Sequence, residues 1–237
     1  CASTFAMFAT GRAFEIIRNS IGYTRANVKI CATHAGITVG EDGASHQTFE
    51  DIALMRTIPG MTVINPSDGV SAKKLLEQAV AMEGPCYVRL GRAKVPVFYE
   101  DSDQLTLGKG NLVRDGKDVT IVATGIMVSE AMAAAEKLKE DGIDARIIDI
   151  HTIKPIDEEI LIKAAQETGA IVTAEEHSII GGLGSAVAEV IVKNCPVKMA
   201  MVGQKDTYGE SGKPDELKKK YGMTAEDIEA AVKNLIG

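Results

Sequence analysis

Residues 28–47 of the 237-residue chain read VKICATHAGITVGEDGASHQ. The first six residues are mostly apolar and predict a buried strand, and the loop that follows holds two histidines, two adjacent carboxylates and three glycines. In an open α/β sheet, ligands bind beyond the carboxyl ends of the strands, where glycine lets the backbone approach closely. Imidazoles transfer protons near neutral pH, and ionised carboxylates accept hydrogen bonds from a polyhydroxylated ligand. The loop could also be a polar turn that caps the next helix, but its density of ionisable groups favours a binding site.

Strands alternate with amphipathic helices along the whole chain. The first half predicts strands at 28–33, 62–65 and 86–90, and helices at 10–20, at 48–56 and from a cap at Ser67 or Asp68 to residue 82. The second half predicts strands at 119–123, 145–150, 170–174 and 197–202, and helices at 128–140, 157–168, 183–193, 215–221 and 224–236. This alternation predicts an α/β fold with two three-layer α/β/α domains and mainly parallel sheets. The expected boundaries are 1–98 for the first domain, 99–118 for a linker and 119–237 for the second domain.

Composition excludes several classes of function. Hydrophobic residues make up 45% and charged residues 25%, which is typical of a soluble globular protein, and the net charge of −7 argues against a nucleic-acid partner. No apolar stretch reaches the length of a membrane span. The four cysteines lack Cys-x-x-Cys spacing, and Cys31 and Cys86 lie in apolar strands, so they are expected to be reduced core residues of a cytoplasmic protein. The four histidines are too scattered for a metal site, and no metal ligands are expected in this chain.

The loop and a series of later motifs resemble those of transketolases. Thr33-His34, Gly40-Glu41-Asp42-Gly43 and Ser45-His46-Gln47 are followed in family order by LMRTIPG at 54–60, NPSDG at 65–69, YVRLGR at 87–92, TIKP at 152–155, EEH at 175–177, GGLG at 181–184 and SGKP at 211–214. The resemblance covers essentially the whole chain. It implies the C-terminal part of a transketolase, with an N-terminally truncated pyrimidine-binding domain and a complete C-terminal domain. The Thr33-His34 pair favours this family over 1-deoxyxylulose-5-phosphate synthases and oxo-acid dehydrogenase components, which share the architecture.

Two aromatic residues near the start resemble cofactor-binding residues of the family. Phe5 and Phe8 are three positions apart, so they share one face if this turn is helical. In the family, matching phenylalanines pack around the aminopyrimidine of thiamine diphosphate, where flat rings give stacking area. The structural alternative is a pair of core aromatics. A third aromatic found in several transketolases is replaced by Gly11, which leaves the pocket more open.

Four polar residues match the family's substrate channel. Arg92 follows a strand at the same sheet edge as the loop, and its planar guanidinium suits a phosphate group. The resemblance implies that His34 assists at the phosphate end and that Asp42 accepts a hydrogen bond from a ketose hydroxyl. His46 is the candidate catalytic residue, since it is expected to lie closest to the thiazolium. Glu41 is interpreted as structural.

The resemblance implies transfer of a two-carbon ketol unit between sugar phosphates in the pentose phosphate pathway. The cofactors of the intact enzyme would be thiamine diphosphate and Mg²⁺, held in the family by a domain with a Gly-Asp-Gly…Asn motif that does not occur in this chain. The chain also opens at Cys1 downstream of the activating glutamate, so the isolated fragment is expected to be inactive. The expected partner is an N-terminal diphosphate-binding domain or subunit, in a homodimer or a heterotetramer.

Two other kinds of function are also compatible with the sequence. The chain could be a non-catalytic assembly module that serves dimer contacts. Gly182-Leu183-Gly184 imitates part of a dinucleotide-binding fingerprint, but position 187 is valine rather than the third glycine, so close helix packing is the better explanation. His151 and His177 follow strands of the second domain and are interpreted as structural.

Overall fold

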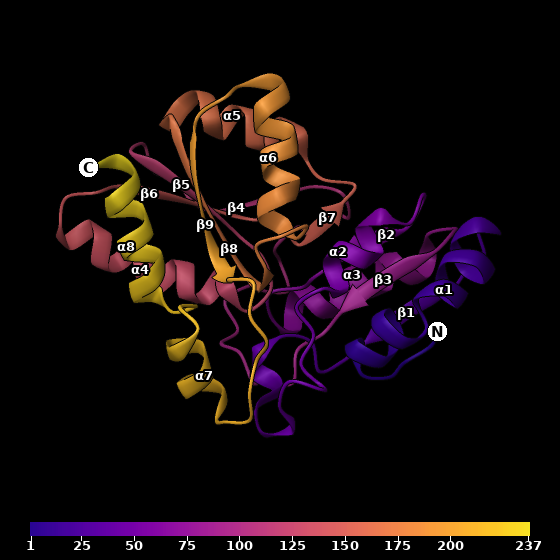
Figure 1. The fold of residues 1–237 in the computed structure, drawn as a ribbon. Helices are drawn as coiled ribbons and strands as arrows, with labels where there is room; N and C mark the ends of the chain where they lie inside the picture. The colour runs from indigo at the N-terminus through magenta and orange to yellow at the C-terminus, as the bar shows by residue number, and fades with distance from the viewer.

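Two mostly parallel sheets form the framework of the molecule, and the computed structural model describes all of residues 1–237 (Figure 1). The first sheet has the order β1-β3-β2-β7, with β1 (Lys29–Ala32), β3 (Cys86–Arg89), β2 (Thr62–Ile64) and β7 (Thr152–Lys154). The second has the order β4-β6-β5-β8-β9, with β4 (Asn111–Arg114), β6 (Ala145–Asp149), β5 (Val119–Ala123), β8 (Ala170–Ser178) and β9 (Lys198–Gln204). The predicted α/β class with mainly parallel sheets is confirmed.

Helices cover both faces of the first sheet because alternate strand residues point to opposite sides. On one face, Tyr87 of β3 packs in a cluster with residues of the helical segment η1 (Met7–Arg12), α1 (Phe14–Ile16) and η2 (Ile17–Tyr23), and of α2 (Asp51–Thr57). On the other face, Cys86 and Val88 pack against Leu75 and Ala79 of α3 (Gly69–Ala81). A capping box between Asp68 and Ser71 begins α3, which decides between the two predicted caps.

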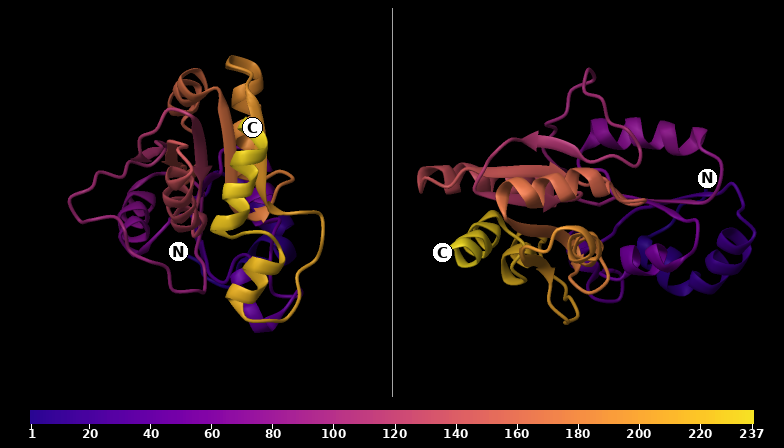
Figure 2. Two further views of the ribbon diagram at one scale, coloured as in Figure 1. Left: turned by 90° about the vertical axis from the view of Figure 1, so that its left-hand side faces the viewer. Right: turned by 90° about the horizontal axis from the view of Figure 1, so that it is seen from above.

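The second sheet is enclosed in the same way. Val122 and Ile171 face α5 (Glu158–Thr168) and α6 (Leu183–Asn194), whereas Ile121 and Val172 face α4 (Met127–Glu140) and α8 (Ala225–Ile236). Figure 2 shows these helices in layers on either side of the strands. The remaining helix, α7 (Pro214–Lys220), lies beside the loop helix η3 (Ile37–Asp42) of the first domain.

One apolar cluster joins the two domains. Its 25 buried residues include Ile52 and Met55 of α2 together with Leu183 and Val187 of α6. Burial of this shared surface stabilises the folded chain and fixes the two sheets relative to each other. No helix has both the length and the apolar character needed to cross a membrane.

Two strands were not predicted. Strand β4 lies within 99–118, the segment expected as a linker, and pairs antiparallel to β6 at the sheet edge, where Leu112 is 53% exposed. Strand β7 comes from the second half of the chain but completes the first sheet by pairing antiparallel to β2. Both are short edge strands, so neither has the long buried run that marks a central parallel strand.

A buried carboxyl group lies at the carboxyl end of β6. Asp149 is fully buried, its Oδ2 accepts hydrogen bonds from Ser67 Oγ at 2.7 Å and Tyr99 Oη at 3.0 Å, and its Oδ1 has no partner. Burial raises the pKa of Asp149 to about 7, against the opposing effect of these two hydrogen bonds. The folded state therefore holds this proton to a higher pH than the unfolded chain does.

Asp149 is expected to make the protein less stable as pH rises from about 4 to about 7, the window between its unfolded and folded pKa values. Asp149→Asn removes this titration. The difference in free energy of unfolding between the variant and the wild type should therefore shift in favour of the variant by about 1 kcal/mol per pH unit within that window. Urea denaturation at a series of pH values measures this, and parallel curves for the two proteins would contradict it.

Candidate functional site

The first part of the site is built where the chain start runs along the edge of the first sheet. Residues 2–5 lie parallel to β1, with Phe5 opposite Thr33, and the Ala6 amide donates to the Thr33 carbonyl at 2.7 Å. This pairing brings Phe5 to the carboxyl end of β1, where the His34 ring stacks on it with centroids 4.0 Å apart and 8° between the planes. A contact between residues 5 and 34 thus follows from strand pairing.

Phe8 and His46 complete a cluster of four rings. The Phe8 ring lies 6.0 Å from that of Phe5 at 19°, and the His46 ring lies 5.3 Å from that of Phe8 at 77°, in an edge-to-face arrangement. All four side chains are partly exposed. Flat rings at these separations stack well on a further aromatic ring. The two phenylalanines are therefore suited to contact a planar ligand.

Both imidazoles are oriented by the residue that precedes them. His34 Nδ1 lies 2.9 Å from Thr33 Oγ1, and His46 Nδ1 lies 2.9 Å from Ser45 Oγ. The Nε2 atom of each ring makes no hydrogen bond within the chain, so it is available to a ligand. A hydroxyl can donate or accept, which allows either tautomer at each position.

Asp42 of this loop and Arg92, which follows β3, form a second group. Arg92 Nη1 lies 3.5 Å from Asp42 Oδ2 and 3.4 Å from Glu41 Oε2, and it also donates to the Val39 carbonyl. All the polar contacts of the Arg92 guanidinium within the chain use Nη1. Its Nε and Nη2 atoms make no hydrogen bond within the chain. The side chains of Arg92 and Asp42 are 42% and 43% exposed, respectively, which leaves both open to solvent.

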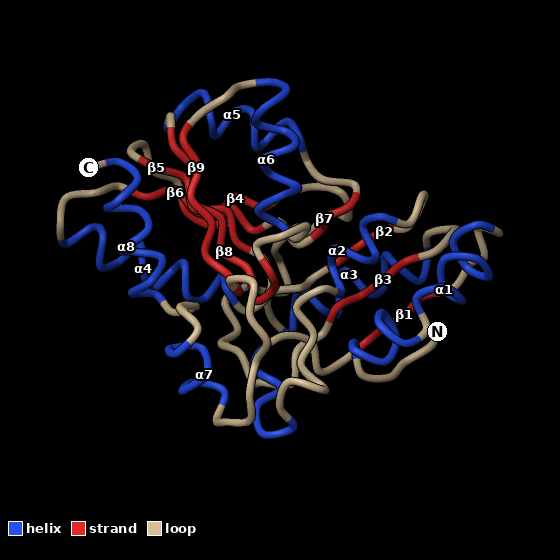
Figure 3. Tube along the Cα trace, in the orientation of Figure 1, coloured by secondary structure: helices blue, strands red, loops and turns tan.

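The six predicted residues thus form two groups beside the His34–Gln47 loop. Phe5, Phe8, His34 and His46 share one ring cluster, whereas Asp42 and Arg92 pair with each other, and no direct contact joins the two groups. Figure 3 shows this loop region at the lower centre, beyond the ends of β1 and β3 and beside α7. No set of three or more His, Cys, Asp or Glu side chains is arranged to hold a metal ion.

The loop is held from beneath by a buried polar network that the sequence reading did not predict. Arg89 Nε and Tyr87 Oη both donate to Asp51 Oδ2 at 2.7 Å, and Arg89 Nη2 donates to the Glu176 carbonyl at 2.8 Å. Burial alone would raise the pKa of Asp51, but the charge of Arg89 holds it below the usual value.

His177 lies beside this network. Its Nε2 accepts a hydrogen bond from the Ala53 amide at 3.3 Å, and burial lowers the pKa of its imidazole, so the ring is neutral. The motif Glu175-Glu176-His177 was the only feature of the sequence that pointed to this buried network.

The glycines before α6 serve helix packing, as predicted. The amides of Leu183 and Gly184 donate to the Glu175 carboxylate at 2.6 and 2.8 Å, respectively. A Cβ at Gly182 would overlap the same carboxylate. The helix N-terminus that a nucleotide phosphate would need is therefore occupied by a side chain of the chain itself.

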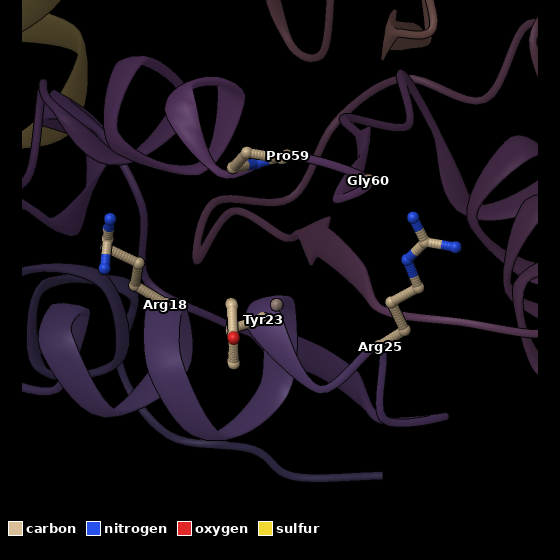
Figure 4. Close-up of a pocket in the computed structure, with 6 residues that line it drawn as sticks. Arg18, Tyr23, Arg25, Pro59 and Gly60 are labelled. Atoms are coloured by element: carbon tan, nitrogen blue, oxygen red, sulfur yellow. The ribbon is translucent and has the colours of Figure 1, made fainter.

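A separate cavity of about 360 Å³ lies at the other edge of the first sheet. Figure 4 shows Arg18 and Arg25 on either side of Tyr23, with Pro59 and Gly60 across from them. The residues of this cavity precede β1 and β2, so it lies at the amino ends of these strands. Ligands of α/β sheets bind at the carboxyl ends, which favours the His34 loop as the functional site.

Comparison with known proteins identifies both domains. Residues 1–97 match the family model described as the transketolase pyrimidine binding domain, and residues 108–228 match that of the transketolase C-terminal domain. A solved structure described as a split gene transketolase, inactive β4 tetramer, superposes with a TM-score of 0.94 and 52% sequence identity, covering 99% of this chain and 75% of that one.

Curated relatives give the same result. A protein of Methanocaldococcus jannaschii whose provisional name is transketolase C-terminal section is 54% identical over 96% of this chain and 72% of its own length. A 6-deoxy-6-sulfo-D-fructose transketolase subunit of Clostridium sp. (strain MSTE9) is 46% identical over 95% of this chain and 70% of its own length. The transketolase of Mus musculus is 38% identical over 99% of this chain, which spans only 38% of that protein.

Proposed function

This chain belongs to the transketolase family, and we propose that it supplies the pyrimidine-binding half of a site that transfers a two-carbon ketol unit between sugar phosphates. The observation that carries the proposal is the four-ring cluster of Phe5, Phe8, His34 and His46 at the carboxyl edge of the first sheet. A binding module without catalysis would not require two imidazoles with free Nε2 atoms in such a cluster.

The ring cluster fits the aminopyrimidine of thiamine diphosphate. Phe5 and Phe8 are partly exposed and nearly parallel, as contact with a flat heterocycle requires. When bound, thiamine diphosphate supplies an electron sink for cleavage of the C2–C3 bond of a ketose. The residues of this chain bind and orient the sugar, and they move or hold protons at its oxygens.

The two imidazoles have different roles in this proposal. His46 packs edge-to-face with Phe8, next to the pyrimidine position, and its Nε2 hydrogen-bonds the substrate carbonyl or hydroxyl at the reacting carbon. His34 stacks on Phe5 and hydrogen-bonds the sugar further along the channel. An imidazole nitrogen can donate or accept a hydrogen bond, which suits both roles.

Arg92 and Asp42 bind the other end of the sugar phosphate. The free Nε and Nη2 atoms of Arg92 offer a planar pair of donors to a phosphate, while Nη1 holds the loop. The paired Asp42 carboxylate accepts from a sugar hydroxyl and so selects the configuration at that carbon. Arg92 Nη1 and Asp42 Oδ2 lie 3.5 Å apart, so the two groups can contact neighbouring parts of one substrate.

A second subunit or domain completes the site in this proposal. No Gly-Asp-Gly motif for the diphosphate and Mg²⁺ occurs in the chain, so these groups are held by a diphosphate-binding partner in a homodimer or heterotetramer. We also propose a cytoplasmic location, which is supported by four free cysteines and by the buried Cys86 thiol, whose pKa burial raises to about 12.

The experiment is a ketol-transfer assay with a ketose phosphate donor, an aldose phosphate acceptor, thiamine diphosphate and Mg²⁺. Turnover is expected when this chain is assembled with a diphosphate-binding partner of the family, and no turnover from this chain alone. The assembled pair with pyruvate as the donor is the control. Turnover of pyruvate without ketol transfer, or clear activity of the chain alone, would contradict the proposal.

A further inference from the structure

Glu176 of the second domain contacts the backbone of the His34–Gln47 loop directly. Its Oε1 accepts a hydrogen bond from the Thr38 amide at 2.7 Å, although the two residues are 138 positions apart. Gly36 has φ +81°, and a Cβ there would overlap the Glu176 carboxylate. The loop therefore closes on this carboxylate, and only glycine lets it do so.

Arg89 keeps the Glu176 carboxylate in place. Its Nη1 lies 3.8 Å from Glu176 Oε2, its Nη2 donates to the Glu176 carbonyl at 2.8 Å, and its Nε donates to Asp51 at 2.7 Å. Glu176 is 2% exposed, Arg89 is also 2% exposed and Asp51 is fully buried. Charge-assisted hydrogen bonds that are shielded from water in this way hold a fixed geometry.

The contact continues to the residues proposed to bind substrate. Thr38 is followed by Val39, whose carbonyl accepts from Arg92 Nη1, and the same Nη1 faces Asp42 at 3.5 Å. A short series of contacts thus joins the Glu176 carboxylate to the Arg92–Asp42 pair. Gln47 adds a second anchor of the loop, since its Nε2 donates to the Glu210 carbonyl of the second domain at 3.0 Å.

We propose that Glu176 is a positioning residue, through which the C-terminal domain sets the placement of Arg92 and Asp42 for the phosphorylated end of the substrate. This inference rests on the proposed function for the identity of the substrate. The part that concerns structure, that Glu176 holds the loop at the Thr38 amide, does not depend on that function. It gives the C-terminal domain a defined part in ketol transfer, although none of its side chains need touch the sugar.

The matched pair of variants is Glu176→Asp and Glu175→Gln. Glu176→Asp keeps the charge but shortens the side chain by one methylene, so it withdraws the acceptor from the Thr38 amide. Glu175 is the adjacent buried carboxylate of β8, and it binds the amides of Leu183 and Gly184 within the second domain instead of the loop. Both changes perturb the same buried strand, but only the first reaches the loop.

In the enzyme assembled with its diphosphate-binding partner, Glu176→Asp is expected to raise KM for a phosphorylated ketose about 10-fold, the effect of losing one charge-assisted hydrogen bond. The KM for an unphosphorylated donor and kcat should change less, and Glu175→Gln should leave the KM of both donors unchanged. Equal KM values in the two variants, or equal increases for both donors, would overturn the inference.

Amide hydrogen exchange tests the structural step without activity. In the full chain, the Thr38 amide is expected to exchange about 10-fold faster in Glu176→Asp than in the wild type, and at the wild-type rate in Glu175→Gln. Unchanged protection of Thr38 in Glu176→Asp would also overturn the inference. Absence of ketol transfer in the wild-type assembly would instead contradict the proposed function and leave the exchange result to decide the positioning role.

Discussion

Replacing Arg89 with methionine is expected to lower the free energy of unfolding by about 3–5 kcal/mol, the cost of leaving a buried charge without its partner. Arg89 is 2% exposed, and without its guanidinium Asp51 and Glu176 would be buried carboxylates facing each other's charge. Methionine fills much of the same volume, so the loss reports the charge and hydrogen bonds rather than a cavity. Denaturant unfolding at neutral pH measures the effect.

Arg114→Met is the matched control for this prediction. Arg114 forms an ion pair with Glu136, whose side chain is 71% exposed, and such surface pairs contribute about 0–1 kcal/mol. A double variant, Arg89→Met with Asp51→Asn, should recover part of the loss because it also removes the unpaired charge of Asp51. Losses of the same size for Arg89→Met and Arg114→Met would contradict the assigned role of the buried network.

Replacing Arg92 with leucine is expected to lower kcat/KM for a phosphorylated ketose donor about 100-fold in the assembled enzyme. Loss of charged hydrogen bonds to a phosphate costs up to about 3 kcal/mol, and each 1.4 kcal/mol is tenfold. Arg92→Lys keeps the charge but not the planar fork, so it should fall between leucine and the wild type. The measurement is a steady-state comparison of each variant with the phosphorylated donor.

An unphosphorylated ketose is the control for Arg92, because its kcat/KM should change far less in Arg92→Leu. Stability is a second control. The Arg92 side chain is 42% exposed, so its ion pairs with Asp42 and Glu41 are screened and contribute at most about 1 kcal/mol. An equal loss of kcat/KM for the two donors would mean that Arg92 supports the loop without binding phosphate.

The elements with a strong local pattern were predicted accurately. Strand β5 is the predicted 119–123, α4 is one residue longer than predicted at Met127–Glu140, and the cap of α3 is one of the two residues named. In these helices and strands, buried apolar residues recur with the period of the element, so a short window of sequence is enough to recognise the element and its bounds. The edge strands β4 and β7 lacked this pattern and were missed.

In the site, too, features encoded locally in the sequence were predicted, and contacts between distant segments were not. The loop after β1 was recognised from its histidines, carboxylates and glycines, and the resemblance to transketolases supplied Phe5, Phe8 and Arg92. The stack of His34 on Phe5 required the pairing of residues 2–5 with β1, and the pairing of Arg92 with Asp42 required β1 and β3 to be neighbours in one sheet. Glu176 was noted only as part of a motif.

The sequence by itself determined the α/β class, the position of the loop and its family, because local periodicity and a linear series of motifs encode these features. Only the tertiary structure decided that Arg89, Asp51 and Glu176 form one buried network and that Glu176 holds the loop at Thr38. The physical reason is that this network spans both domains, since Asp51 and Arg89 belong to the first and Glu176 lies in β8 of the second sheet. Packing of the two domains brings together side chains whose spacing along the chain carries no signal of contact.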